Sequence, residues 1–188
     1  MQLSTRSLPE DVKLKFYAVL CGDESINDFE QWLYSSKQIE AVLHPDDYLN
    51  LLSLDYSSSL VRVNLIGILE NLVSSGEYET YRVKQMLRDF LGQTKGIESS
   101  VKLLTEFYDL YCRGVSFLDS LGLNYGLSVV CLDVDSLAKR ERYVESLLPD
   151  AKREARKVLH YLENGTVKIL NTEQYSYYFR CLDHRRSD

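Results

Sequence analysis

The chain has 188 residues, of which 45% are hydrophobic and 27% are charged, and this composition is typical of one globular domain and unlike that of a disordered chain. Its formal net charge is −6, with 20 acidic and 11 basic side chains in residues 1–135 and 8 acidic and 11 basic side chains in residues 136–188. An acidic excess of this kind repels nucleic acid, since affinity for phosphate comes from Lys and Arg.

Targeting and metal-binding signals are missing from the sequence. The N-terminus has no apolar segment typical of a signal peptide, and no apolar run approaches the roughly 20 residues that span a bilayer. The four cysteines are too far apart in sequence for a zinc knuckle or a Cys-x-x-Cys pair, and such isolated cysteines are typical of core residues in a reducing compartment. We therefore expect a cytoplasmic protein without a cofactor, a metal or a membrane contact.

Helices are predicted along the first two thirds of the chain. The first begins at Leu8–Asp11, because proline and early carboxylates suit the first turn of a helix, and it ends at Gly22. Ser25 and Asp28 have the spacing of a capping box and begin the next helix. The segment 60–73 is apolar over most of its circumference, which predicts a place at the centre of the helical bundle. Apolar residues at helical spacing predict further helices over residues 39–43, 46–54, 77–91 and 97–112, with a short turn over 117–121.

The pattern changes after residue 126. Leu127–Leu132 is short and rich in β-branched residues, which favours a strand. Two helices are predicted next, over Asp135–Leu148 and Asp150–Glu163, on either side of Pro149. This last third of the chain therefore mixes strand and helix signals.

A β-hairpin is predicted near the C-terminus. Asn164-Gly165 is a strong turn signal, and the two runs after it, Val167–Leu170 and Tyr175–Leu182, are predicted to pair. All of these elements together predict a mainly α single domain over residues 1–188, a bundle of about eight helices with a small β-hairpin or sheet near the C-terminus. In this arrangement residues 1–126 form the helical core, and residues 127–188 pack on it as a strand, two helices and a hairpin.

The sequence lacks the motifs of common catalytic sites. It has no Gly-x-Ser-x-Gly nucleophile turn, no phosphate-binding loop, no His-Glu-x-x-His zinc motif and no calcium loop, and its three histidines lie far apart. The paired carboxylates Asp46-Asp47 and Glu77 with Glu79 lie at predicted helix starts, where the helix dipole favours negative charge. We therefore expect no enzyme activity, although a triad that only the fold assembles stays open at this point.

An acidic stretch with nearby tyrosines is the candidate binding surface. Between Asp23 and Asp55 the sequence holds eight carboxylates against one cation, Lys37. The chain also has 14 tyrosines, and tyrosine suits binding surfaces because it offers a rigid ring with a hydrogen-bonding tip. A solvated acidic face and half-buried tyrosines explain the same patterns without a partner. The residues predicted to contact a partner are Asp46, Asp47, Asp55 and Tyr56, with Glu77 and Glu79 as a second set.

Three stretches of the chain resemble a group of small acidic bacterial proteins. The stretches are INDFEQWLY (26–34) with YLNLLSLDY (48–56), GEYETY (76–81), and FYDLYCRG (107–114) with FLDSLGLNYGL (117–127). Some proteins of this group are immunity partners of contact-dependent or other polymorphic toxins. The resemblance therefore implies an immunity protein, and no functional residue is carried over, because such proteins diverge at the surface that faces the toxin.

The charge of the chain fits this implied function. Many toxins of these systems are nucleases with basic substrate grooves, and an acidic protein is steered toward such a groove and can occlude it. The expected partner is therefore a basic protein toxin domain. Three other interpretations stay open, namely a non-catalytic helical adaptor, an unrecognised enzyme, and a regulator that binds nucleic acid through the basic segment Lys152–Lys157.

Overall fold

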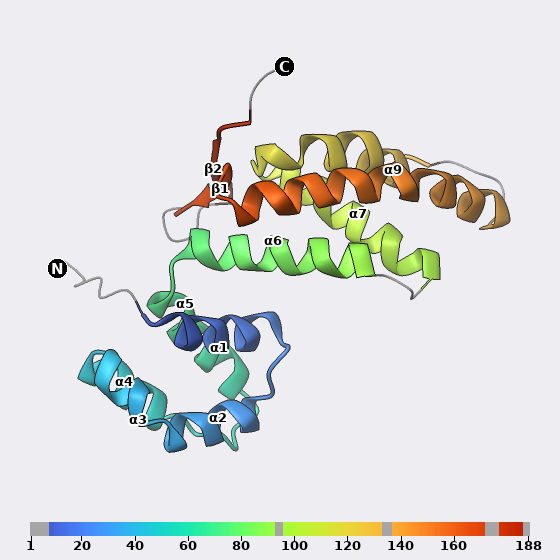
Figure 1. The fold of residues 1–188 in the computed structure, drawn as a ribbon. Coiled ribbons are helices and arrows are strands. Elements are labelled where there is room, and N and C mark those ends of the chain that lie inside the picture. The colour runs from blue at the N-terminus through green and yellow to red at the C-terminus, as the bar shows by residue number, and fades with distance from the viewer. Residues whose placement is uncertain (1–7, 93–95, 133–136, 172–176, 186–188) are drawn as a thin grey trace. The chain divides into compact units, whose positions relative to one another are not determined.

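The computed structural model describes residues 8–92, 96–132, 137–171 and 177–185 (Figure 1). These residues form nine α-helices and a small two-stranded antiparallel sheet near the C-terminus, and 75% of the structure is helical. The predicted mainly α fold with a late hairpin is thereby confirmed.

The chain divides into two compact units, unit 1 over Met1–Ser74 and unit 2 over Ser75–Asp188. Each unit has its own hydrophobic core, and the two cores share no residue. The division falls in the turn cluster Ser74-Ser75-Gly76 and not at residue 126, where the sequence pattern changes. The expected single domain stays a prediction, which a measurement of cooperativity can test.

Local signals set the ends of the helices in unit 1. Gly22 follows the first helix with a φ of +83°, and its N–H bonds to the carbonyl groups of the last turn. Ser25 caps the second helix, because its Oγ accepts a hydrogen bond from the Asp28 N–H (3.1 Å) and donates one to the Asp28 carboxylate (2.6 Å). Both predicted helix ends are confirmed. The helices of unit 1 are α1 (Glu10–Cys21), α2 (Ile26–Ser35), α3 (Lys37–Val42), α4 (Pro45–Leu52) and α5 (Val61–Leu72).

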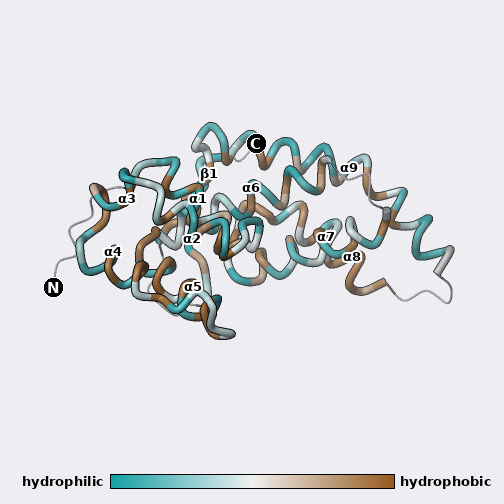
Figure 2. The backbone as a smooth tube through the Cα atoms, turned by 90° about the horizontal axis from the view of Figure 1, so that it is seen from below, coloured by the Kyte–Doolittle hydropathy of each residue, from teal (hydrophilic) through white to brown (hydrophobic). Residues whose placement is uncertain are grey.

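The core of unit 1 is built around three aromatic rings. Phe16 of α1 lies 6.1 Å from Phe29 and 6.2 Å from Trp32, between ring centroids, and the latter two lie 5.5 Å apart on α2. Apolar residues recur along the helices (Figure 2), so that one face of each helix is available to this core. Trp32 is the only tryptophan of the chain, and its fluorescence therefore reports on unit 1.

Helix α5 does not lie at the centre of a bundle, and that prediction was wrong. Val61, Leu65 and Leu69 are buried, but Val63 on the opposite side is 69% exposed. The apolar circumference of the helix led to the prediction, whereas the short helices of unit 1 cover only one of its faces. Burial of a helix is decided by how many neighbours surround it and not by its composition alone.

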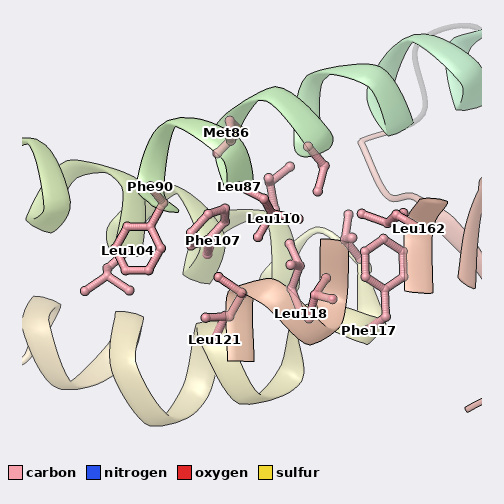
Figure 3. Packing of buried hydrophobic residues seen from close by; sticks show 14 of the residues in the cluster. Met86, Leu87, Phe90, Leu104, Phe107, Leu110, Phe117, Leu118, Leu121 and Leu162 are labelled. Carbon is pink, nitrogen blue, oxygen red and sulfur yellow. The ribbon is translucent and has the colours of Figure 1, made fainter. Parts of the chain in front are cut away.

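Unit 2 contains the three longest helices of the described chain, α6 (Ser75–Gly92), α7 (Gly96–Cys112) and α9 (Leu137–Glu163), together with several short elements. The short elements are the 3-10 turn η1 (Ser116–Leu118), the π-helical segment η2 (Ser120–Gly126), α8 (Leu127–Val130), β1 (Val167–Leu170) and β2 (Arg180–Asp183). Helices α6, α7 and α9 and segment η2 contact one another around one core. Figure 3 shows Phe90, Phe107 and Leu104 gathered in this core. The Phe90 and Phe107 rings meet edge to face at 5.8 Å.

Two secondary-structure predictions in unit 2 were wrong. Leu127–Leu132 is not a strand, because η2 continues directly into helix α8, whose Val129 is buried in the core that contains α7. The two helices predicted around Pro149 are one helix, α9. Pro149 and Glu145, the residue four positions before it, are both exposed, so that water can satisfy the carbonyl group that proline leaves unbonded.

The hairpin forms at the predicted place. Strands β1 and β2 pair antiparallel, with Val167 opposite Asp183 and Leu170 opposite Arg180. Gly165, with a φ of +77°, and the Asn164 side chain, which accepts a hydrogen bond from the Thr166 N–H (3.0 Å), form the turn before β1. The second predicted strand, Tyr175–Leu182, begins only at Arg180, and its first two residues lie outside the described part of the chain.

Candidate partner-binding site

The net charge of the chain belongs to unit 1. Residues 1–74 hold 11 acidic and 5 basic side chains, a net charge of −6, and residues 75–188 hold 17 of each, a net charge of zero. The negative potential is therefore concentrated on the smaller unit, where it can attract a basic partner.

Helix α4 carries two carboxylates in its first turn and one exposed leucine. Its first turn contains Asp46 and Asp47, where the helix dipole favours negative charge, and His44 precedes it with Nδ1 accepting a hydrogen bond from the Asp46 N–H (3.3 Å). Leu49, one turn after Asp46, is 60% exposed, whereas Leu51 is buried in the core. An exposed leucine therefore lies beside a carboxylate at the surface.

The carboxylate of Asp55 is exposed in the segment after α4. Its Oδ1 accepts hydrogen bonds from the Ser57 hydroxyl (2.6 Å) and the Ser57 N–H (3.0 Å), and these bonds lower the pKa of Asp55 below its ordinary value. The two hydrogen bonds thus favour the ionised form of Asp55 and restrain its side chain. We use the name acidic surface for Asp46, Asp47, Leu49 and Asp55, which belong to one stretch of unit 1.

The Tyr56 hydroxyl group is engaged within unit 1, and the contact of Tyr56 with a partner stays a prediction. Its hydroxyl donates a hydrogen bond to the Leu51 carbonyl oxygen (3.1 Å), and burial, with Tyr34 and Glu30 nearby, raises the pKa of Tyr56. The Tyr56 ring supports Tyr34, whose centroid lies 6.5 Å away and whose side chain is 59% exposed. Tyr34 is thus the exposed aromatic residue that the sequence prediction missed, and its one signal was its place beside the apolar face of α2.

Glu77 and Glu79 are placed on helix α6, in unit 2. The Glu79 carboxylate binds the Arg82 guanidinium at 2.8 Å and is largely buried, while Glu77 is exposed in the first turn of the helix. An internal ion pair and a helix start account for these residues locally. Both belong to unit 2, and their role as a second contact set stays a prediction.

The described residues also bear on two other functions, metal binding and membrane insertion. No group of three or more His, Cys, Asp or Glu residues in its described ranges is placed to hold a metal ion. Among the same residues, no helix is both long enough and apolar enough to cross a membrane.

Comparison of the chain with protein-family models, with curated proteins and with solved structures finds no match. The resemblance to toxin-immunity proteins therefore stays a prediction. The residues of the acidic surface, and not a relative, carry the functional argument.

Proposed function

We propose that this chain is a non-catalytic immunity protein, which neutralises a basic protein toxin domain by covering its active site with the acidic surface. The observation that carries the proposal is the segregation of charge, since the whole net charge of −6 belongs to unit 1. Unit 1 also exposes Asp46 and Leu49 on α4, and the ring of Tyr34 on α2. A mixed acidic and apolar surface suits protein recognition better than simple solvation does.

The two kinds of side chain have different tasks in this proposal. The carboxylates steer a basic toxin toward the surface and fix its orientation, which raises the rate of association at low salt. Leu49 and Tyr34 bury apolar area on contact and slow dissociation. A nuclease groove that binds phosphate offers the cations that the carboxylates require.

Two residues of the proposed binding region are restrained before binding. The Ser57 hydrogen bonds restrain Asp55, and the Tyr34 ring contacts Tyr56, which packs against the core. A surface that is already ordered loses less side-chain entropy when the partner binds. This feature favours tight inhibition over a weak encounter.

The proposal is tested with the tagged full chain as bait in the lysate of its own organism, at low and high salt, with partners read by mass spectrometry. We expect one stoichiometric partner with a basic domain. The variant Asp46→Asn/Asp47→Asn/Asp55→Asn should lose it, because Asn keeps the side-chain size and much of the capping while it removes three charges. The matched control is Asp89→Asn/Glu141→Gln/Glu145→Gln, which removes three exposed charges of unit 2 and should retain the partner.

Neutralisation is measured separately from capture. The captured partner is expressed in bacteria alone, with the wild-type chain, or with the triple Asn variant, and growth is followed. Protection by the wild type and by the unit 2 control, but not by the triple Asn variant, supports the immunity function. A partner that is bound but harmless points to the adaptor function, and the absence of any partner at both salt concentrations contradicts the proposal.

A further inference from the structure

The hairpin of unit 2 has one buried and one exposed face. Val167 and Ile169 of β1 point into the core, and the residues between and after them, Lys168 and Leu170, point outward. The antiparallel register places Leu182 opposite Lys168, and Arg180 opposite Leu170. The outer face therefore carries two cations and two leucines, and none of its four paired residues is acidic.

An exposed aromatic pair precedes β2. Tyr177 is 65% exposed and Tyr178 is 63% exposed, and their rings meet edge to face at 5.1 Å. The Arg113 guanidinium lies 5.2 Å from the Tyr177 ring centroid and 4.7 Å from that of Phe179. Two hydrogen bonds to the backbone hold these stacked residues together. Arg113 Nε donates to the Tyr177 carbonyl oxygen (3.3 Å), and the Phe179 N–H donates to the Arg113 carbonyl oxygen (2.7 Å).

The close approach of backbone at this point holds the stack in place. A Cβ added at Gly114 would lie 2.5 Å from the Phe179 carbonyl oxygen, and Gly114 has a φ of +97°. Asp183, the acid at the end of β2, is engaged by Arg185, whose Nη2 lies 2.8 Å from the Asp183 carboxylate. Arg113 is thus held beside the Tyr177 ring, and Arg180 follows the aromatic pair at the start of β2.

We propose that the outer face of the hairpin binds an acidic, partly apolar segment of a partner protein. The cations Lys168, Arg180 and Arg113 would pair with its carboxylates, while Leu182 and the two tyrosines would cover its apolar side chains. Tyr and Arg are the residue types that dominate the energy of protein interfaces. We call Lys168, Arg180, Arg113, Leu182, Tyr177 and Tyr178 the hairpin surface, which is distinct in unit and in sign of charge from the acidic surface.

The geometry favours a protein segment over a single-stranded nucleic acid. Successive bases stack on rings that lie parallel to them, whereas the Tyr177 and Tyr178 planes cross at 88°. The hairpin surface also has three cations, fewer than the many phosphate contacts that sustain binding to a nucleic acid. The exposed Leu182 suits an apolar side chain of a peptide and has no counterpart in a sugar-phosphate backbone.

The test measures binding of three labelled probes to the full chain by fluorescence anisotropy, at low and moderate salt. The probes are a short peptide of alternating acidic and apolar residues, its counterpart with Asn and Gln in place of the acids, and an oligothymidine of similar length. We expect the acidic peptide to bind, the amide peptide to bind at least roughly tenfold more weakly, and salt to weaken the binding. Tighter binding of the oligothymidine, or no binding of the acidic peptide at low salt, overturns the proposal.

Variants locate the binding on the hairpin surface. Lys168→Gln/Arg180→Gln removes two exposed charges and should weaken peptide binding by roughly tenfold. The control Arg140→Gln/Arg142→Gln removes two exposed charges at the start of α9 and should leave it unchanged. The variant Tyr177→Ser/Tyr178→Ser tests the contribution of the two rings to peptide binding. If this variant unfolds the hairpin, the affinity of Lys168→Gln/Arg180→Gln still tests the proposal. Unchanged affinity of Lys168→Gln/Arg180→Gln for the peptide contradicts the proposal. If the variant Asp46→Asn/Asp47→Asn/Asp55→Asn still binds the peptide, the hairpin surface acts separately from the proposed immunity function.

Discussion

The Tyr56 hydroxyl group stabilises unit 1 from inside. It donates its hydrogen bond to the Leu51 carbonyl oxygen while its ring packs against the core. Burial raises the pKa of Tyr56, because the phenolate would lose both hydration and this hydrogen bond. The group therefore favours folding in its neutral form. Its contribution is complete below the pKa of an unfolded tyrosine, about 10, and is lost as the pH rises through the higher folded value.

Substitution Tyr56→Phe should change the alkaline stability of unit 1. At neutral pH we expect a loss of about 1 kcal/mol in the free energy of unfolding, the net value of one hydrogen bond. Above about pH 10 the wild type should lose stability more steeply than the variant. The measurement is urea unfolding followed by Trp32 fluorescence, with the exposed Tyr34→Phe as control. Equal alkaline losses in wild type and Tyr56→Phe would show that Tyr56 titrates normally.

At the scale of elements, the contact between η2 and α7 depends on glycine. A Cβ added at Gly126 would overlap the Leu104 carbonyl oxygen and lie 2.8 Å from the Tyr108 Cβ. Neither backbone nor a Cβ atom can move aside as a flexible side chain can. The two segments therefore lie close together only because Gly126 has no side chain.

Substitution Gly126→Ala should destabilise unit 2 although it improves the helix propensity of the segment. Propensity favours Ala by up to about 1 kcal/mol, while overpacking costs about 1–3 kcal/mol, so that the overlap prevails. Thermal unfolding of the full chain followed by circular dichroism measures the effect. Gly92→Ala, whose Cβ would meet nothing within 4 Å, is the control in the same unit and should be neutral or stabilising. A neutral Gly126→Ala would show that η2 can move away from α7.

At the scale of the whole molecule, the separate cores predict separate cooperative units. The aromatic cluster around Phe16 stabilises unit 1, and the cluster around Phe90 and Phe107 stabilises unit 2. No buried side chain belongs to both clusters. Removal of buried volume in one unit is therefore expected to weaken that unit first.

Substitution Leu65→Ala tests this expectation. Leu65 is fully buried in unit 1, and truncation of such a leucine costs about 2–5 kcal/mol. Hydrogen exchange read by mass spectrometry should show lower protection in α1, α2 and α5, with little change in α6, α7 and α9. Leu104→Ala, buried in unit 2, should give the reverse pattern. An equal loss in both units would instead establish the single cooperative domain predicted from the sequence.

The partner-binding residues predicted from the sequence stay a prediction, and the structure adds their local surroundings. Asp46, Asp47 and Asp55 belong to one stretch of unit 1, as their nearness in sequence requires. Only packing decides which of two aromatic residues faces the core, and here the Tyr56 hydroxyl bonds inside unit 1 while the Tyr34 ring is exposed. Glu77 and Glu79 lie on α6 in unit 2, a placement that their charge could not indicate.

The sequence alone determined the features of this protein that depend on neighbouring residues. Gly22, Ser25 and Asn164-Gly165 end or begin elements by their own backbone preferences and hydrogen bonds, and these act over a few residues. The helical state of Leu127–Val130, the single buried face of α5 and the division at Ser74 were decided only by the tertiary structure. They depend on contacts between residues that are distant in the sequence, and a local pattern that fits two structures is resolved by the one that buries more apolar surface.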